Sequence, residues 1–342
     1  MKRLLFSIIF SGYICLVFGQ INNTYTNSTI LKGEYLGQTP PSTTAELFAP
    51  DIISNGLVNR DVTISPDGKE MYFSTYVRGF KYSTIVFSKQ INGVWTKPEA
   101  APFATNPRYS YIEPMFSCDG KKLFFVSENH SDKDNNIVNK DIWVMNRIND
   151  KWGKPTNIGA PINTNEGEFF PSFTSDGTMY FTRDDKKDRV SYIFRSNYIN
   201  GKYTTPTKLP KQINCGADRF NAFVAPDESY VLISAVGVEE YTRGVNYYIV
   251  FRNNDNTWSE PINLGNKINT PRGNGWSIYM SPDEKYIFFI ATKELPSSKR
   301  PTLISLDFLK NLSTMPENGN ADIYWISAKV IEKLKKSVQE SK

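Results

Sequence analysis

Polar and aromatic residues that could bind or cleave a ligand gather in five short segments of the 342-residue chain. Carboxylates in such segments could act as general acid and base, as in the hydrolysis of glycosidic bonds. Arginines could hold a carboxylate by paired hydrogen bonds, and tyrosine or tryptophan could lie flat against a sugar ring. The segments are Asn59–Asp61, Arg108–Glu113, Asn165–Glu168, Asp218–Asn221 and Arg272–Trp276.

Eight residues from these segments are the candidate ligand-binding residues. Two interpretations of them stay open. In one, they cap the ends of strands and bind water in a polar channel. In the other, they bind a sugar-like or other small polar ligand. The candidates are Arg60, Asp61, Tyr111, Glu113, Glu168, Arg219, Asn221 and Trp276.

Catalysis is the alternative to simple binding. Two of Asp61, Glu113, Glu166 and Glu168 could provide the carboxylate pair of a hydrolase. Asp61, Glu113 and Asn221 are also residue types that bind divalent cations. Phe170, which stands at the equivalent position of a further repeat, argues against a metal. The only histidine, His130, excludes a centre with several histidine ligands. We therefore predict no catalytic residue, no bound metal and no cofactor.

A turn motif that occurs five times indicates what must position these residues. Each copy ends in Asp-Gly or Asp-Glu and precedes an aromatic or aliphatic run such as Met71–Phe73, and successive aspartates are 52, 57, 51 and 56 residues apart. Repeats of this length are typical of solenoids and propellers. The copies are Ser65–Gly68, Ser117–Gly120, Thr174–Gly177, Ala225–Glu228 and Ser281–Glu284, and their alignment makes Asp61, Glu113, Phe170, Asn221 and Ser277 equivalent.

The repeats carry the signals for four antiparallel strands per unit. Asp-Gly and Asn-Gly supply the positive φ angles of two-residue hairpin turns, so each turn joins two strands. In the first four repeats a proline follows three residues after an aromatic, as in Trp95 and Pro98, which is typical of an outer edge strand. Radial stacking of four-stranded sheets would bury the aromatic runs between neighbours. The pattern predicts an all-β propeller.

The turn Ser65–Gly68 (Ser-Pro-Asp-Gly) and the segment Asn92–Pro98 (Asn-Gly-x-Trp-x-x-Pro) resemble the TolB-type, WD-repeat-like β-propeller family. The resemblance runs from about Leu47 to Ser327 and implies an exported bacterial protein, usually with six blades. We count five turn motifs, and six blades remain the alternative. We expect Glu46–Ser54 to close the ring as the outer strand of the blade that ends at Ile323–Ser327.

The two ends of the chain lie outside the repeats. Lys2 and Arg3, followed by an apolar run, are typical of a signal peptide, and the run is too short to span a membrane. Apolar residues at helical spacing near the C-terminus indicate an amphipathic helix. The predicted parts are a signal peptide at residues 1–19, a polar linker or strap at 20–45, the propeller at 46–327 and a short C-terminal helix at 328–342.

These features predict an exported protein, periplasmic or extracellular, that binds or scaffolds through the loops at the mouth of its channel. The formal net charge of +5, without a basic stripe, argues against nucleic-acid binding. We expect a monomer whose partner is a protein, a carbohydrate or another small polar ligand, with no transmembrane segment after removal of the signal. The alternative is a secreted hydrolase, glycosidase- or lactonase-like, that uses the channel carboxylates.

The sequence also places the two cysteines of the mature chain far apart. Cys118 lies in a turn on one face of the predicted propeller, and Cys215 lies in a loop on the opposite face. A disulfide requires Cα atoms within about 7 Å of each other. We therefore expect both cysteines to stay free in an oxidising compartment.

Overall fold

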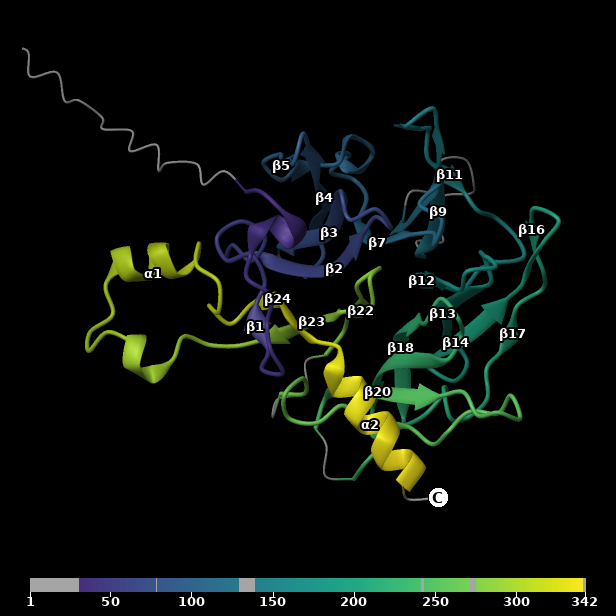
Figure 1. Ribbon diagram of the computed structural model, residues 1–342. Helices are drawn as coiled ribbons and strands as arrows, with labels where there is room; N and C mark the ends of the chain where they lie inside the picture. The colour runs from purple at the N-terminus through teal and green to yellow at the C-terminus, as the bar shows by residue number, and fades with distance from the viewer. Residues whose placement is uncertain (1–30, 78, 129–138, 241–242, 271–274, 341–342) are drawn as a thin grey trace, which may run out of the picture. The chain divides into compact units, whose positions relative to one another are not determined.

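The computed structural model describes residues 31–77, 79–128, 139–240, 243–270 and 275–340. Within them the chain forms a β-propeller of five four-stranded blades (Figure 1), so the repeat count is confirmed and the six-blade alternative is wrong. One compact unit begins at Leu31. No helix in the described part of the chain is long and apolar enough to cross a membrane. The predicted signal peptide and His130 lie outside the described residues.

Each blade is an antiparallel sheet that runs from the channel outward. The channel strands are β2 (Val58–Ile64), β7 (Tyr111–Phe116), β12 (Glu168–Phe173), β18 (Asp218–Val224) and β22 (Ile278–Met280). The second strands are β3 (Glu70–Val77), β8 (Lys122–Ser127), β13 (Met179–Asp185), β19 (Tyr230–Val236) and β23 (Tyr286–Thr292). The third strands are β4 (Tyr82–Ile91), β9 (Asp141–Ile148), β14 (Val190–Ser196), β20 (Val245–Phe251) and β24 (Ala321–Ser327).

The outer strands are short, and in blades 1 to 3 they are split. Pro98, Pro155 and Pro206 lie between the two pieces, because proline has no N–H to donate to the neighbouring strand. This confirms the predicted edge strands. The pieces are β5 (Val94–Trp95) and β6 (Glu99–Ala100) in blade 1, β10 (Lys151–Trp152) and β11 (Thr156–Asn157) in blade 2, and β16 (Lys202–Tyr203) and β17 (Thr207–Lys208) in blade 3. The piece β16 pairs with β15 (Tyr198–Ile199). In blade 4 the outer strand is β21 (Ile262–Asn263).

The two kinds of turn differ from each other. At Asn92 and Gly93 both φ angles are positive (52° and 79°), as a two-residue hairpin turn requires and as the sequence predicts. The Asp-Gly turns are longer than predicted. Gly68 N–H donates to Ser65 O at 2.8 Å, and within that turn only Gly68 has a positive φ. A type I turn followed by one left-handed residue explains this geometry, and Asp67 Oδ1 accepts the N–H two residues on.

The predicted closing strand is confirmed, although it is shorter than expected. β1 (Glu46–Leu47) pairs with β24 and completes blade 5. The next residue, Phe48, is fully buried, and its N–H donates to Ile323 O of β24 at 2.8 Å. Its ring lies 5.0 Å from Phe288 and 5.1 Å from Trp325, centroid to centroid, in edge-to-face contacts. The last strand of the chain, β24, thus joins the first strand, β1, through backbone pairing, and an aromatic cluster adds to the contact.

The segment before β1 contacts both of the blades that meet where the ring closes, blade 1 and blade 5 (the seam). Tyr35 lies in the 3₁₀ turn η1 (Glu34–Gly37), is buried, and donates its hydroxyl hydrogen to Asp283 of blade 5 at 2.7 Å. On the other side, Trp95 of blade 1 donates its Nε1–H to Gly33 O at 2.8 Å. The segment therefore contacts both the first and the last blade.

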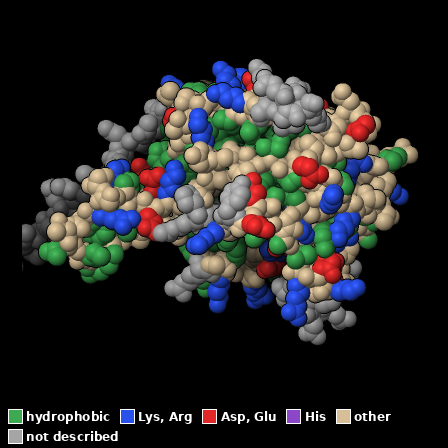
Figure 2. Space-filling model, turned by 90° about the horizontal axis from the view of Figure 1, so that it is seen from below, with side chains coloured by type: hydrophobic (Ala, Val, Ile, Leu, Met, Phe, Trp, Pro, Cys, Tyr) green, Lys and Arg blue, Asp and Glu red, His purple; other side chains and the backbone are tan. Residues whose placement is uncertain are grey.

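Two faces of the propeller are distinguished by their connections. The turn face carries the five Asp turns, for example Ser65–Gly68. The channel-mouth face carries the loops that lead into the channel strands and the loops between the second and third strands. The longest of these, the blade 5 arm (residues 293–320), contains η3 (Ser297–Lys299) and α1 (Leu306–Leu312) and extends away from the blades (Figures 1 and 2).

The helix α2 (Lys329–Glu340) follows β24 and corresponds to the predicted C-terminal helix. Ile331 is buried against the core, where Val330 and Leu334 also pack. The two cysteines occupy different surroundings, because the half-buried Cys118 lies by Phe173 O while Cys215 belongs to a separate buried cluster. A further 3₁₀ turn, η2 (Pro102–Ala104), precedes β7.

The seam should be sensitive to Phe48. Replacement Phe48→Ala removes a fully buried ring between two aromatic neighbours, so the free energy of unfolding should fall by about 3 kcal/mol or more. Denaturant unfolding followed by tryptophan fluorescence measures this. Glu46→Ala, in the adjoining strand β1 but exposed, should change stability by less than about 0.5 kcal/mol. Equal losses in the two variants would contradict the role of the ring.

Candidate functional site

Four of the five channel strands contain a β-bulge at the positions that the repeat alignment made equivalent. The pairing with the second strand shifts there by one residue, and the bulged residue takes a positive φ. A bulge turns its side chain out of the regular alternation, here toward the channel. The bulged residues are Asp61 (56°), Glu113 (56°), Phe170 (49°) and Asn221 (51°).

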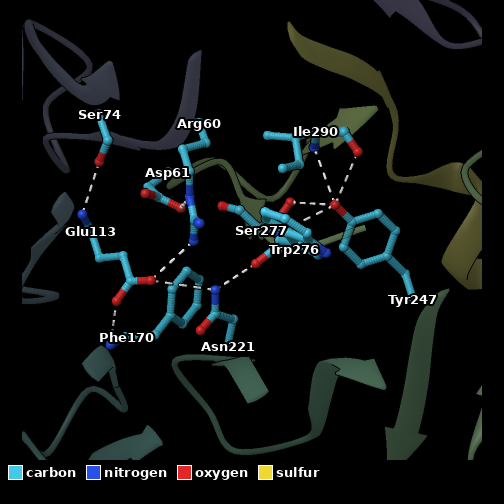
Figure 3. A network of polar contacts seen from close by, with 10 residues as sticks. All are labelled: Arg60, Asp61, Ser74, Glu113, Phe170, Asn221, Tyr247, Trp276, Ser277 and Ile290. Atoms are coloured by element: carbon cyan, nitrogen blue, oxygen red, sulfur yellow. Dashed lines mark hydrogen bonds and ion pairs between the residues drawn. The ribbon is translucent and has the colours of Figure 1, made fainter. Parts of the chain in front are cut away.

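Arg60 lies at the centre of a buried polar network (Figure 3). Its Nε contacts Asp61 Oδ1 at 2.7 Å and its Nη2 contacts Glu113 Oε1 at 3.0 Å, so the guanidinium points between the two carboxylates. Asn221 Nδ2 donates to Glu113 Oε1 at 3.5 Å and also to the backbone oxygen of Trp276. Arg60, Asp61 and Glu113 are each only 3% exposed. The buried network therefore joins blades 1, 2, 4 and 5, and its charged groups come from blades 1 and 2.

The network contains one guanidinium and two carboxylates, and this excess of negative charge contributes to the pKa of Glu113. Burial raises the pKa of Glu113 to about 7, Asp61 adds to the shift, and Arg60 opposes it. For Arg60, burial disfavours the charged form, but the two carboxylates outweigh it and raise the pKa further above its ordinary value. Arg60 is therefore permanently charged, while Glu113 titrates near neutrality.

The bulged residues also link the blades through their backbone. Glu113 N–H donates to Ser74 Oγ of blade 1 at 2.8 Å, and Asn221 N–H donates to Thr182 Oγ1 of blade 3 at 3.0 Å. In both cases the acceptor is a hydroxyl on the second strand of the preceding blade, opposite the residue before that blade's bulge. The bulges at Glu113 and Asn221 thus each donate one hydrogen bond to the preceding blade.

Blade 2 lacks this hydroxyl. Val126 stands where blades 1 and 3 have Ser74 and Thr182, and it cannot accept a hydrogen bond. The bulge N–H of Phe170 in blade 3 donates instead to Glu113 Oε2 at 2.8 Å. Because an unsatisfied buried N–H costs about 1–3 kcal/mol, the carboxylate of Glu113 has a structural task in the channel.

Blade 4 uses a tyrosine for the same purpose. The hydroxyl of Tyr247 accepts the N–H of Ser277 at 3.3 Å and lies 2.8 Å from Ser277 O and 3.0 Å from Ile290 O. Gly275 makes room for this ring, since a Cβ at that position would lie 2.6 Å from the Tyr247 ring. Figure 3 shows Tyr247 reaching the ends of the blade 5 strands beside Trp276.

Two predicted site residues lie outside the network. Tyr111 is buried between blades, with its ring 6.3 Å from that of Phe125. Glu168 is fully buried, forms an ion pair with Arg183 at 2.7 Å, and accepts the N–H of Thr164 at 2.9 Å. Both residues stabilise the loops that lead into the channel strands.

Arg219 likewise braces a loop. It donates to Cys215 O at 2.9 Å and to Ser191 O at 3.1 Å, and it is 5% exposed. Trp276, in contrast, is 37% exposed and precedes β22 at the channel-mouth face. The structure therefore brings Arg60, Asp61, Glu113, Asn221 and Trp276 together and places Tyr111, Glu168 and Arg219 elsewhere.

The channel does not present an arranged metal site among the described residues. Arg60 already occupies the position between Asp61 and Glu113 that a cation would take, and no described group of three or more His, Cys, Asp or Glu side chains is placed to hold a metal ion. Two buried oxygens, Asp61 Oδ2 and Asn221 Oδ1, accept no hydrogen bond from the described atoms. These oxygens suit a donor such as water or a ligand hydroxyl.

The sequence reading missed a set of asparagines that hold the loops on this face. Asn269 Oδ1 accepts Tyr247 N–H at 2.7 Å, and its Nδ2 donates to Tyr247 O at 3.0 Å. Asn163 and Asn214 form the same pair of bonds with Ile142 and Ile193. The signal was present as a repeated Ile-Asn dipeptide in three repeats: Ile162-Asn163, Ile213-Asn214 and Ile268-Asn269.

The raised pKa of Glu113 predicts a pH-dependent stability. The carboxyl of Glu113 stays protonated up to a pH of about 7 in the folded protein, whereas its ordinary pKa is 4.5. Protonation of Glu113 therefore contributes fully to the free energy of unfolding below pH 4.5, and this contribution is lost as the pH rises toward 7. The Glu113→Gln variant should lack this part of the decline. Urea unfolding across that pH range measures it. Parallel pH profiles for the two proteins would contradict the assignment.

No protein-family model and no curated protein sequence matches this chain. Among solved structures it is similar to TolB from Acinetobacter baumannii, with 15% identity and a TM-score of 0.46, over 80% of this chain and 57% of the TolB chain. It is also similar to a thermostable family-43 glycoside hydrolase (12% identity, TM-score 0.46, 79% and 88% covered). A third is the arabinanase Arb43A of Bacillus subtilis (12%, 0.44, 79% and 94%). These similarities concern the fold alone.

Proposed function

We propose that this protein is an exported binding or scaffolding propeller whose ligand or partner docks on the channel-mouth face. One observation carries the proposal. Two buried oxygens, Asp61 Oδ2 and Asn221 Oδ1, lack a donor among the described atoms, and Asn221 also holds the backbone of the exposed Trp276. Hydrogen-bond acceptors beside an exposed indole suit a ligand with hydroxyl groups and an apolar face, as a sugar has.

A cavity on the same face supports a docking role. It has a volume of about 370 Å³ and lies where β3 ends and β4 and β7 begin. Leu57, Val77, Tyr82 and Tyr109 contribute its mainly apolar lining. A mixture of aliphatic walls and tyrosines is typical of surfaces that receive a side chain of a protein partner or an apolar part of a ligand.

A secreted hydrolase is the second candidate, and the pKa of Glu113 favours it. A carboxyl with a pKa near 7 beside a second carboxylate has the properties of a general acid. However, both oxygens of Glu113 already accept hydrogen bonds, from Arg60 and from Phe170 N–H. A hydrolase would turn over chromogenic glycosides or lactones, and Glu113→Gln would abolish that turnover. We expect no such turnover.

The docking face can be tested by paired substitutions. A glycan array and a periplasmic extract supply the ligand, and its dissociation constant is then measured by calorimetry. Trp276→Ala on the channel-mouth face should weaken binding by about tenfold or more, which corresponds to roughly 1.4 kcal/mol. Asp119→Ala, on the turn face, is the control and should leave binding unchanged. Loss of binding in folded Asp119→Ala alone would reject the assignment of the face.

A further inference from the structure

The blade 5 arm exposes a cluster of aliphatic side chains. Its helix α1 buries no residue, and the large apolar side chains around it face solvent. Figure 2 shows hydrophobic side chains gathered on this projecting part of the molecule, with basic groups beside them. A single exposed leucine is ordinary, but a contiguous group marks an interaction site. The exposed fractions are 83% for Leu303, 73% for Ile304, 66% for Leu306, 48% for Leu309 and 43% for Met315.

The arm is fixed at its base rather than hanging from a loose tether. Asn318 Nδ2 and Asn320 Nδ2 both donate to Gly56 O, at 3.0 and 2.7 Å. Gly56 has a φ of 88°, and a Cβ there would lie 2.7 Å from the backbone carbon of Thr314, so the arm packs directly on this glycine. The base is therefore held against blade 1 while the aliphatic tip is kept away from the core.

The charges around the tip favour an anionic surface. Three basic side chains and one acidic side chain lie within residues 296–315, and all four are exposed. Glu294 forms an ion pair with Arg300 at 3.0 Å and so offsets one of the three positive charges, while Glu317 accepts the hydroxyl hydrogen of Tyr324 at 2.8 Å. The four charged residues near the tip are Lys299, Arg300, Asp307 and Lys310.

We propose that the blade 5 arm inserts its tip into the headgroup region of a membrane that contains anionic lipids. Protein–protein hot spots are rich in tryptophan, tyrosine and arginine, whereas leucine is under-represented among them. The tip offers Leu303, Ile304, Leu306 and Leu309 on a convex projection, flanked by lysines. The aliphatic side chains suit contact with lipid acyl chains, and the lysines suit contact with the lipid phosphate groups around them. Insertion would turn the channel-mouth face toward the membrane.

Vesicle flotation tests this directly. The probes are vesicles of phosphatidylcholine alone and vesicles with about a third phosphatidylglycerol. The chain starting at Gln20 is used, because the apolar run before it would bind vesicles by itself, and the compact unit from Leu31 onward stays whole. Wild type should float with the anionic vesicles. Replacing Leu303, Ile304, Leu306 and Leu309 by serine should reduce the floated fraction by about tenfold or more.

A matched control removes aliphatic side chains of similar exposure elsewhere. Ile91, Ile148 and Ile199 are 50%, 63% and 53% exposed at the outer hairpin turns, and their replacement by serine should leave flotation unchanged. Leu303→Ser alone is a second variant in case the fourfold variant does not fold. Flotation that is equal for wild type and arm variants, or absent for wild type, would overturn the proposal. So would a dimer, seen by sedimentation velocity, that the arm variant dissociates without any lipid binding.

Discussion

One kind of backbone hydrogen bond, from a bulged channel strand to the preceding blade, recurs at the centre of this propeller. Glu113, Phe170 and Asn221 each direct a bulge N–H toward the preceding blade, and that N–H is buried where water cannot satisfy it. A side chain of the neighbouring blade must therefore accept it. Ser74 and Thr182 do so with a hydroxyl, whereas blade 2 has Val126 at that position and the side chain of Glu113 accepts the N–H of Phe170 instead.

The valine at this position of blade 2, Val126, explains the charged groups of the channel. Glu113 replaces the missing hydroxyl with a carboxylate, whose burial requires a cation, and Arg60 provides it from blade 1. Asp61 orients Arg60, and its negative charge adds to the effect of burial, which is the main cause of the raised pKa of Glu113. Glu113 resembles a catalytic acid in its pKa, but its buried position is explained by the hydrogen bond that joins blades 2 and 3. The ligand binding that we propose uses Asp61 Oδ2, Asn221 Oδ1 and the exposed Trp276, at the channel-mouth face.

The repeated parts of the fold could be predicted from the sequence, and the pairing between repeats could not. Five Asp turns give five blades, and their alignment finds the bulge positions, because both depend on local spacing. Ser74 and Thr182 were missed because their role depends on register across two strands and on the next blade. Arg219 was expected in the site because it is a polar residue beside a channel strand. It instead binds Cys215 O, four residues earlier along the chain.

The most direct measurement is a double-mutant cycle on Glu113 and Val126. Val126→Thr places a hydroxyl where Ser74 and Thr182 have theirs, so Phe170 N–H gains a second acceptor. Glu113→Met removes both acceptor oxygens at a similar side-chain length, and the free energy lost on this change should then be smaller in the Val126→Thr background, by about 1 kcal/mol. Urea unfolding of the four proteins at one pH gives the coupling energy. Equal losses in both backgrounds would contradict the account, because Glu113 would then not stand in for the missing hydroxyl.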